Sequence, residues 1–583
     1  MSDDRIDRRQ VLARLGALAA APPARRAVAR ARRQVDEARF AWGVASFDPT
    51  ADGVLLWTRT DPAAGDAELR WAVAADPDLT EVVAEGTVAA TAATDHCATV
   101  EVSGLPAGGV WWYRFEDADG ARSPTGRTRT LPAGAVDRLR IATVSCSRFR
   151  DGRFAVYRCL ADREVDLVVH LGDYVYEDGE AGVRAHDPPE RLTTLTHYRR
   201  RYAQHRADPD LQALHAAHPM VAVWDDHEVA DNAWRDGAAG HDDARDGPWA
   251  DRLAAAMRAH EEWVPGRTRR RGDGGVDAWR AVAIGELAEL LVLDTRRQRD
   301  RQATTPADLA APGRQLLGNE QRAWLTERLR RPDRPPWVLL ANQVMLHPLR
   351  VPMPSAALAE QVTRAGFLVV EGEALNPDQW DGYPREREAL VAAAGDAGGV
   401  VVLTGDVHSS WAWEGPGTTA DGEPAMVELV TPSVSSRPFS QRLPLPAGTV
   451  EALLRGLDPS LSHVELSRHG YVVVDLGPEE LQAEWWYVEP DDPSTQAFGT
   501  ARRTPRAAPM HLVEVAEPRP DPVPTTTTTA ATTTTAGPAP GTPAEDGGGT
   551  GDGAGPWPVL GGVGALVAAG AGAAVALRRR RGP

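Results

Sequence analysis

The stretch VDLVVHLGDYVYE, residues 165–177, decides the fold because a short apolar run passes directly into a group of polar side chains. Continuous apolar runs of this length are typical of strands that are buried on both faces of a sheet. Gly172, Asp173 and Tyr176 follow where such a strand would end. Ligands of open α/β sheets bind beyond the carboxyl ends of the strands, so these side chains are candidates for a site.

Five other apolar runs repeat this arrangement. The six predicted strands are Leu139–Val144, Val165–Leu171, Met220–Trp224, Leu290–Leu293, Trp337–Ala341 and Val400–Thr404. The polar ends that follow them are Ser145–Arg148, Gly172–Glu177, Asp225–Glu228, Asp294–Arg296, Asn342-Gln343 and Gly405–Ser409. Helix-like segments lie between the strands, at Tyr198–Ala216, Arg252–Trp263 and Glu320–Leu329. This alternation predicts an α/β fold in which all six strands deliver polar groups to one edge.

The side chains at these strand ends indicate a metal centre. Carboxylates crowded in a cleft without cations would repel one another and take up protons. Cys146 and Tyr176 add a thiolate and a phenolate, which favour a transition metal over magnesium. Two metals about 3.5–4 Å apart can clamp a phosphoryl group and lower the pKa of a bound water. An aspartate that bridges two metals is therefore expected here.

The remainder of the chain carries no comparable group of residues. From about residue 40 to 132, short apolar runs alternate with Gly, Pro and Asp turns, which predicts a β-sandwich with an accessory role. The formal net charge of −18 argues against nucleic acid as a binding partner. Three cysteines are too few for a disulfide framework, and a single Cys97–Cys159 bridge stays open.

Both ends of the chain resemble targeting segments. Arg8 and Arg9 precede a weakly apolar run, as in a twin-arginine export signal; the alternative is a disordered basic leader. A Thr/Pro/Gly-rich stretch of about 518–556 predicts an extended, disordered stalk. The uncharged segment Trp557–Leu577 is long enough to span a membrane, and four arginines follow it. This predicts a single-pass helix with a cytoplasmic C-terminus and an extracellular body; a processed sorting signal is the alternative.

The motifs, taken in order, resemble the PhoD (alkaline phosphatase D) family of calcineurin-like metallophosphoesterases. They are "GVASFDPT" (43–50), "HLGDYVYE" (170–177), "WDDHE" (224–228), "LDTR" (293–296), "WDGYP" (380–384), "LTGDVHSS" (403–410) and "TPSVSSR" (431–437). The resemblance implies a four-layer α/β/β/α sandwich preceded by a small all-β sandwich domain. The expected divisions are a leader (1–37), the N-terminal domain (38–135), a catalytic domain (136–515), the stalk (516–556), and the membrane helix with its tail (557–583).

The same resemblance implies roles for individual residues. Cys146, Tyr176 and His408 would bind the first metal, with Asp173 as the bridge. Asp226 and Asp406 would bind the second metal, and Asn342 would either complete it or contact only substrate. The family pairs ferric iron with a divalent ion, often calcium, and the acidic second site suits a hard cation.

The residues around the metals complete this expectation. His227 would either protonate the leaving oxygen or donate to the phosphoryl group. Arg148 would contact phosphate through its guanidinium fork. Asp294 with Arg296 is interpreted as a structural ion pair.

The predicted function is extracellular, metal-dependent hydrolysis of a phosphate monoester or diester. One alternative is a surface-displayed binding or structural module on an inactive enzyme fold, which the stalk and anchor fit equally well. A serine hydrolase that uses Ser145 or Ser409 is a third possibility, but the chain lacks a Gly-x-Ser-x-Gly elbow at these serines. The sequence predicts neither the oligomeric state nor the physiological substrate.

Overall fold

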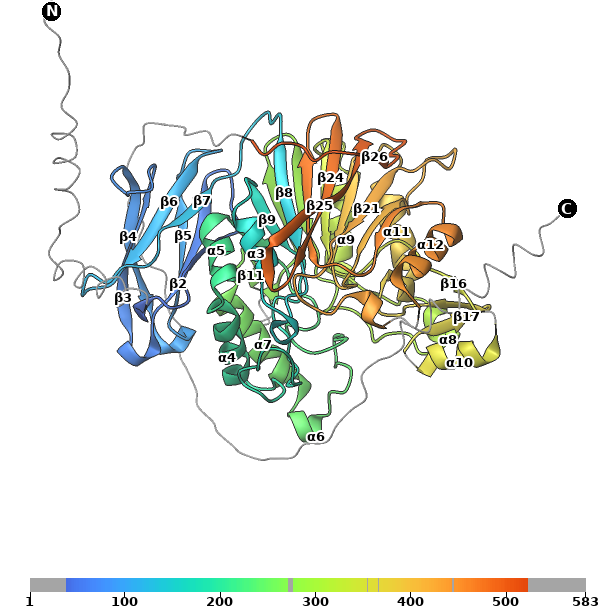
Figure 1. The fold of residues 1–583 in the computed structure, drawn as a ribbon, viewed down its shortest axis with the longest axis horizontal. Helices are drawn as coiled ribbons and strands as arrows, with labels where there is room; N and C mark the ends of the chain where they lie inside the picture. Colours follow the sequence, from blue (N-terminus) through green and yellow to red (C-terminus); the bar gives the residue numbers. More distant parts are fainter. Residues whose placement is uncertain (1–37, 271–275, 354, 365, 443–444, 523–583) are drawn as a thin grey trace, which may run out of the picture.

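A computed structural model describes residues 38–522, apart from 271–275, 354, 365 and 443–444 (Figure 1). The predicted leader (1–37) and the predicted membrane helix with its tail (557–583) lie outside the described residues, as do positions 523–556 of the predicted stalk. Within the part of the chain that is described, no helix has both the length and the apolar character that a membrane crossing requires.

Two mixed sheets form the centre of the molecule. The larger has ten strands, in the order β26 (Val513–Val515), β25 (Asp492–Pro505), β24 (Glu480–Glu489), β23 (Gly470–Leu476), β8 (Leu139–Val144), β9 (Leu167–His170), β10 (Met220–Ala222), β1 (Val44–Phe47), β2 (Gly53–Arg59) and β5 (Cys97–Ser103). The smaller has seven, in the order β13 (Arg280–Ile284), β14 (Ala288–Val292), β15 (Trp337–Asn342), β19 (Val400–Thr404), β21 (Met426–Val430), β20 (Ser410–Glu414) and β22 (Leu461–Glu465). Strands β8, β9 and β10 run parallel, as do β14, β15, β19 and β21.

Alternate residues along the strands face different cores, and this alternation builds four layers. Ile141 of β8 packs between the two sheets, in the same core as Leu339 of β15. Its neighbour Ala142 faces the helices on the outer side of the larger sheet. These helices are α3 (Ala155–Ala161), α4 (Leu195–Arg206), α5 (Pro209–Ala217) and α7 (Trp249–Trp263). Helices α9 (Asn319–Arg330) and α11 (Pro384–Ala394) cover the smaller sheet in the same way, through Leu325 and Leu390.

The N-terminal β-domain shares a sheet with the rest of the molecule. Strands β1, β2 and β5 extend the ten-stranded sheet, and β1 pairs directly with β10. The opposing sheet has the order β4 (Val82–Ala90), β3 (Ala67–Ala74), β6 (Val110–Glu116) and β7 (Gly126–Arg129). In β2, Leu56 faces the core of this sandwich while Trp57 faces the helices over the large sheet. The predicted sandwich exists, but it is fused to its neighbour through continuous strand pairing.

The helix predicted at Tyr198–Ala216 is two helices. Asp208 lies between α4 and α5 and caps the start of α5. Its carboxylate accepts hydrogen bonds from the N–H groups of Asp210 and Leu211. Pro209 occupies the first position of α5, where a missing N–H costs nothing. The smaller elements are α6 (Asp243–Asp246), α8 (Pro306–Ala310), α10 (Ala356–Arg364), α12 (Ala447–Leu457), β11 (Arg269–Arg270), β12 (Val276–Asp277), β16 (Val351–Pro352), β17 (Leu368–Val370) and β18 (Glu373–Leu375).

The first residues of the predicted stalk belong to the folded body. Arg519 pairs with the buried carboxylate of Asp475 at 3.1 Å. Asp521 pairs with Arg163 at 2.9 Å. Both contacts lie on the ten-stranded sheet or on the loop after α3, so the body continues past the predicted boundary at residue 515.

Candidate metal centre

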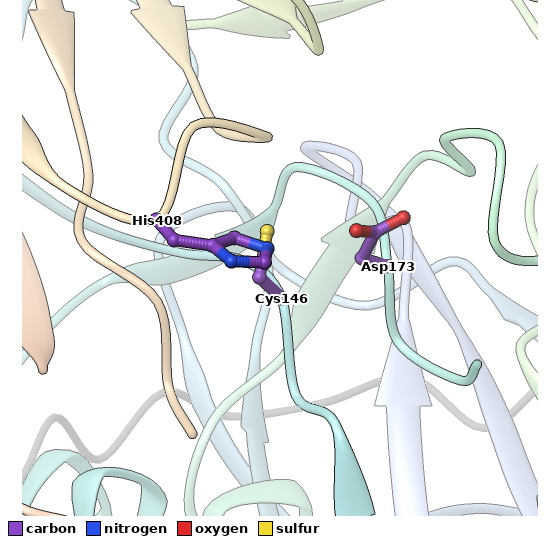
Figure 2. Close-up of side chains that lie close together, drawn as sticks. All are labelled: Cys146, Asp173 and His408. Carbon is purple, nitrogen blue, oxygen red and sulfur yellow. The ribbon is translucent and has the colours of Figure 1, made fainter. Parts of the chain in front are cut away.

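The carboxyl ends of strands from both sheets meet at one edge of the molecule. Cys146 follows β8 and Asp173 follows β9, both in the larger sheet, whereas His408 follows β19 of the smaller one. Figure 2 shows these three side chains close together, although 262 positions separate the first from the last in the sequence. One sulfur, carboxylate oxygen or ring nitrogen from each lies within 4.8 Å of the others.

Four of the converging residues have a left-handed backbone that only glycine adopts without cost. The φ angles are 60° for Cys146, 57° for Asp173, 64° for Asp406 and 51° for His408. Such conformations persist where the surrounding structure enforces them, and they cluster at functional sites. Here they turn the chain sharply at the ends of β8, β9 and β19. The turns bring side chains from separate loops to a common space.

Two further groups extend the cluster. Asp173, Asp226 and His227 form one, and Asp225, Asp226 and Asp406 form the other, each with ligand atoms within 4.8 Å of one another. Asp173 belongs to the first two groups and Asp226 to the last two. The three groups are therefore continuous, and they join at Asp173 and at Asp226.

The cluster fits the metals that the sequence implies. Oδ1 of Asp173 and Oδ1 of Asp226 are buried and have no hydrogen-bond partner among the described residues. Burial and the nearby Asp173 raise the pKa of the Cys146 thiol well above its ordinary value. Buried carboxylate oxygens without partners are costly, and a cation would relieve that cost and favour the thiolate. The donor set is thus suited to cations.

Tyr176 and His408 face this cluster with fixed orientations. The Tyr176 hydroxyl donates to Oδ2 of Asp173 at 2.8 Å and lies 3.2 Å from Nε2 of His408. Ser436 in turn donates to the Tyr176 oxygen at 2.8 Å. Nδ1 of His408 lies 3.0 Å from the carbonyl oxygen of Arg437 and must donate to it, so Nε2 is left with a free lone pair toward the cluster.

His227 has a buried carboxylate partner that the sequence interpretation missed. Its Nδ1 donates to Oε2 of Glu177 at 2.7 Å, and the ring lies against Tyr176 at a tilt of 31°, with centroids 4.2 Å apart. Burial opposes a charged ring, but the carboxylates of Asp226, Asp173 and Glu177 outweigh it and raise the pKa of His227 well above its ordinary value. Glu177 is the last residue of the motif at 170–177, one position beyond a predicted ligand, and its position is the signal that could have found it.

The acidic side of the cluster contains a buried arginine. The Arg296 guanidinium bonds to Asp225 and Asp378, whereas Asp294 accepts the backbone N–H groups of Arg296 and Arg297. The predicted Asp294–Arg296 ion pair is therefore wrong. Asp294 instead caps its own loop, and the arginine extends to carboxylates near the predicted ligands Asp226 and Asp406.

Asn342 and Arg148 are engaged in other contacts. Oδ1 of Asn342 accepts from the Trp380 indole at 3.1 Å, and its amide nitrogen donates to the carbonyl oxygen of Val344. Its carboxamide is thereby used to hold neighbouring loops, and no contact supports its prediction as a ligand. Arg148 pairs with Asp178 at 2.6 Å and lies over the Tyr176 ring at 5.2 Å, so its charge is directed to the rim of the site.

Comparison with known proteins identifies the family of this chain. The profile described as "PhoD-like phosphatase" matches residues 141–485. The chain belongs to the PhoD-like phosphatase family. A second profile, for the PhoD-like phosphatase N-terminal domain, matches residues 26–132.

Individual relatives agree with this membership. Alkaline phosphatase D of Bacillus subtilis is 37% identical over 400 residues, which is 64% of this chain and 65% of the relative's own length. A solved structure of PhoD superimposes with a TM-score of 0.72 at 31% identity, over 83% of this chain and 93% of that one.

All the predicted ligands lie within the PhoD-like phosphatase match. The predicted resemblance is confirmed for the body of the chain, from the N-terminal domain to β24. The three cysteines are free, so the Cys97–Cys159 bridge does not form.

Proposed function

We propose that this chain hydrolyses phosphate esters with the aid of bound metal ions at the Cys146–Asp173–Asp226–Asp406–His408 cluster. The single observation that carries the proposal is the continuity of the three ligand groups, with unpartnered carboxylate oxygens at the two residues that join them. Membership of the PhoD-like phosphatase family supports the same reaction class. The substrate is a phosphate monoester or diester.

The ligands divide by chemistry into two halves. Cys146, Tyr176 and His408 with Asp173 offer sulfur, phenolate, imidazole and carboxylate, which suit ferric iron. Asp173, Asp226 and Asp406 offer only oxygen and suit a hard divalent ion such as calcium. When bound, such ions supply Lewis acidity toward the phosphoryl oxygens and lower the pKa of water.

The protein's own side chains then orient the substrate and supply a proton to the leaving group. His227 is one-fifth exposed and Asp406 slightly more, so the phosphoryl group can approach the cluster from solvent on this side. Glu177 holds Nδ1 of His227, which directs Nε2 away from the carboxylate. The Glu177 carboxylate stabilises the protonated ring, and that proton can pass from Nε2 to the departing alkoxide oxygen.

The test is hydrolysis of a phosphomonoester and a phosphodiester by residues 38–522, with and without prior chelation. Wild type and Asp173→Ala are assayed together, with Cys159→Ala as a matched control because Cys159 lies outside the cluster. We expect activity that requires both metal and Asp173. A folded protein that turns over neither substrate after iron and calcium have been added would instead favour the binding-module function.

The location of the activity is a separate part of the proposal and rests on the sequence alone. We propose that the chain is exported through the Arg8-Arg9 signal and is held at the extracellular face of the cell membrane by residues 557–577. Changing both arginines to lysine should keep the protein in the cytoplasm. Carbonate extraction should release a chain truncated after residue 522 but not the full chain; release of both would contradict the anchor.

A further inference from the structure

Arg296 lies at the base of the acidic half of the centre and is almost completely buried. Its side chain is 2% exposed. Nε donates to Oδ1 of Asp225, and Nη1 donates to both oxygens of Asp378 at 3.0 and 2.9 Å. These bonds fix the plane of the guanidinium, since two of its three nitrogens are held by separate carboxylates.

The third nitrogen faces the carboxylates at which the divalent ion is proposed to bind. Nη2 lies 3.5 Å from Oδ1 of Asp226 and 3.9 Å from Oδ1 of Asp406. It is buried and has no hydrogen-bond partner among the described residues. Oδ1 of Asp226 is likewise buried without a partner. The two groups attract each other electrostatically, but each lacks a direct bond.

The charges around Arg296 do not balance. Asp225, Asp226 and Asp406 present three carboxylates within 4.8 Å, while Arg296 is the cation nearest to them and also serves Asp378. His227 beside Asp226 can add a second positive charge, but its Nδ1 is paired with Glu177. The cations around these three carboxylates therefore carry too little positive charge to neutralise them.

We propose that Arg296 is the resident counter-charge that allows Asp225, Asp226 and Asp406 to pack together before a divalent ion binds, and that it competes with that ion for the same carboxylates. The inference rests on the proposed function for the identity of the ion. Arg296 positions the ligands and tunes their affinity without touching substrate. Two cations that neutralise the same carboxylates weaken each other's binding.

Arg299 provides a matched control. It is also fully buried and also pairs with Asp378, at 3.1 Å, but it has no salt bridge to Asp225, Asp226 or Asp406. Replacing either arginine by methionine removes a buried charge and leaves Asp378 less well paired. Only Arg296→Met removes a cation from the metal-binding carboxylates.

The experiment measures calcium binding by titration calorimetry and the denaturation midpoint with and without calcium, in residues 38–522. Without calcium, both methionine variants should unfold more easily than wild type. Arg296→Met should bind calcium about tenfold more tightly, or better, and should gain more thermal stability from it, because a like charge has been removed from the ion's vicinity. Arg299→Met should keep the wild-type affinity, and Arg296→Lys should lie between wild type and Arg296→Met.

The double variant Arg296→Met/Asp225→Asn guards against misfolding, because it removes the carboxylate that loses its partner together with the arginine. It should fold without calcium and still bind the ion more tightly than Asp225→Asn alone. Unchanged or weaker calcium binding in the variants that lack Arg296 would overturn the inference. Wild-type phosphatase activity in the same preparation reports on the proposed function separately.

Discussion

Replacing Glu177 by glutamine should move the alkaline limb of the pH–rate profile to lower pH. Glu177 is buried, accepts Nδ1–H of His227 at 2.7 Å, and accepts the backbone N–H of Asp231 at 2.8 Å. Glutamine is isosteric, but Oε2 holds His227 and Oε1 holds Asp231, so its single carbonyl oxygen can keep the bond to His227 only by giving up the bond to Asp231. The negative charge beside His227 is lost in either case. A hydrogen bond to a charged group contributes about 1.5–3 kcal/mol. At about 1.4 kcal/mol per pKa unit, the pKa of His227 should fall by roughly one to two units.

The sign of the effect follows from the state that His227 must occupy. The protonated ring is the acid, and it is present below its pKa, so a lower pKa removes activity from the high-pH side first. Above the new pKa, hydrolysis of an alkyl phosphate should fall by about 10- to 100-fold, because its alkoxide needs a proton.

A p-nitrophenyl ester should lose much less, since p-nitrophenolate leaves without a proton. The assay is kcat against pH for both esters, with Glu180→Gln as the control because Glu180 is a half-exposed neighbour that pairs with Arg150 and not with His227. Equal losses for both esters, or an unmoved alkaline limb, would refute the reasoning.

Three other predictions test the site and the core. Chelation should abolish hydrolysis, and iron with calcium should restore it, as followed by turnover of a phosphomonoester. Cys146→Ser should lower iron content and activity at least about tenfold because a hydroxyl is a harder and weaker ligand, whereas Cys159→Ser should leave both unchanged. Burial lowers the pKa of His170 and of His260 to about 3, so the unfolded chain binds more protons between pH 3 and 6.5. The free energy of unfolding should therefore fall by up to about 1.4 kcal/mol per pH unit for each histidine as pH drops through that window, and denaturant titrations that show constant stability from pH 6.5 to 4 would contradict this.

The strands were predictable because each is buried on both faces. Such strands are continuous apolar runs, and β8 and β19 begin and end at the predicted residues. The division of six strands between two sheets was not readable from the runs themselves, because strand pairing is a long-range property. The same limit applies to β1, which pairs with β10 across more than 170 residues of sequence and thereby joins the N-terminal domain to the large sheet.

The candidate ligands were predictable because they follow directly after strands, where the fold leaves few directions open. Asn342 also follows a strand, but its contact with Trp380 depends on a loop almost forty residues later. Arg296 reaches Asp225 from a different sheet, so its neighbours could not be read from its own motif. Position at a strand end therefore predicts presence near the site, whereas the partner of each side chain depends on how the two sheets are stacked.

The residues with a left-handed backbone conformation link the stacking of the two sheets to the geometry of the site. A non-glycine residue in this region costs of order 1 kcal/mol or more, and Cys146, Asp173, Asp406 and His408 all occupy it. Glycine would remove the strain, but it would also remove the ligand atom. The cost must therefore be met by the packing around the turns, and Gly172 shows how close that packing is: a Cβ there would lie 2.5 Å from Cβ of Asp225. Loops from β9 and β10 can approach this closely only where the residue before Asp173 has no side chain, so the glycine admits the close contact and the aspartate beside it carries the chemistry.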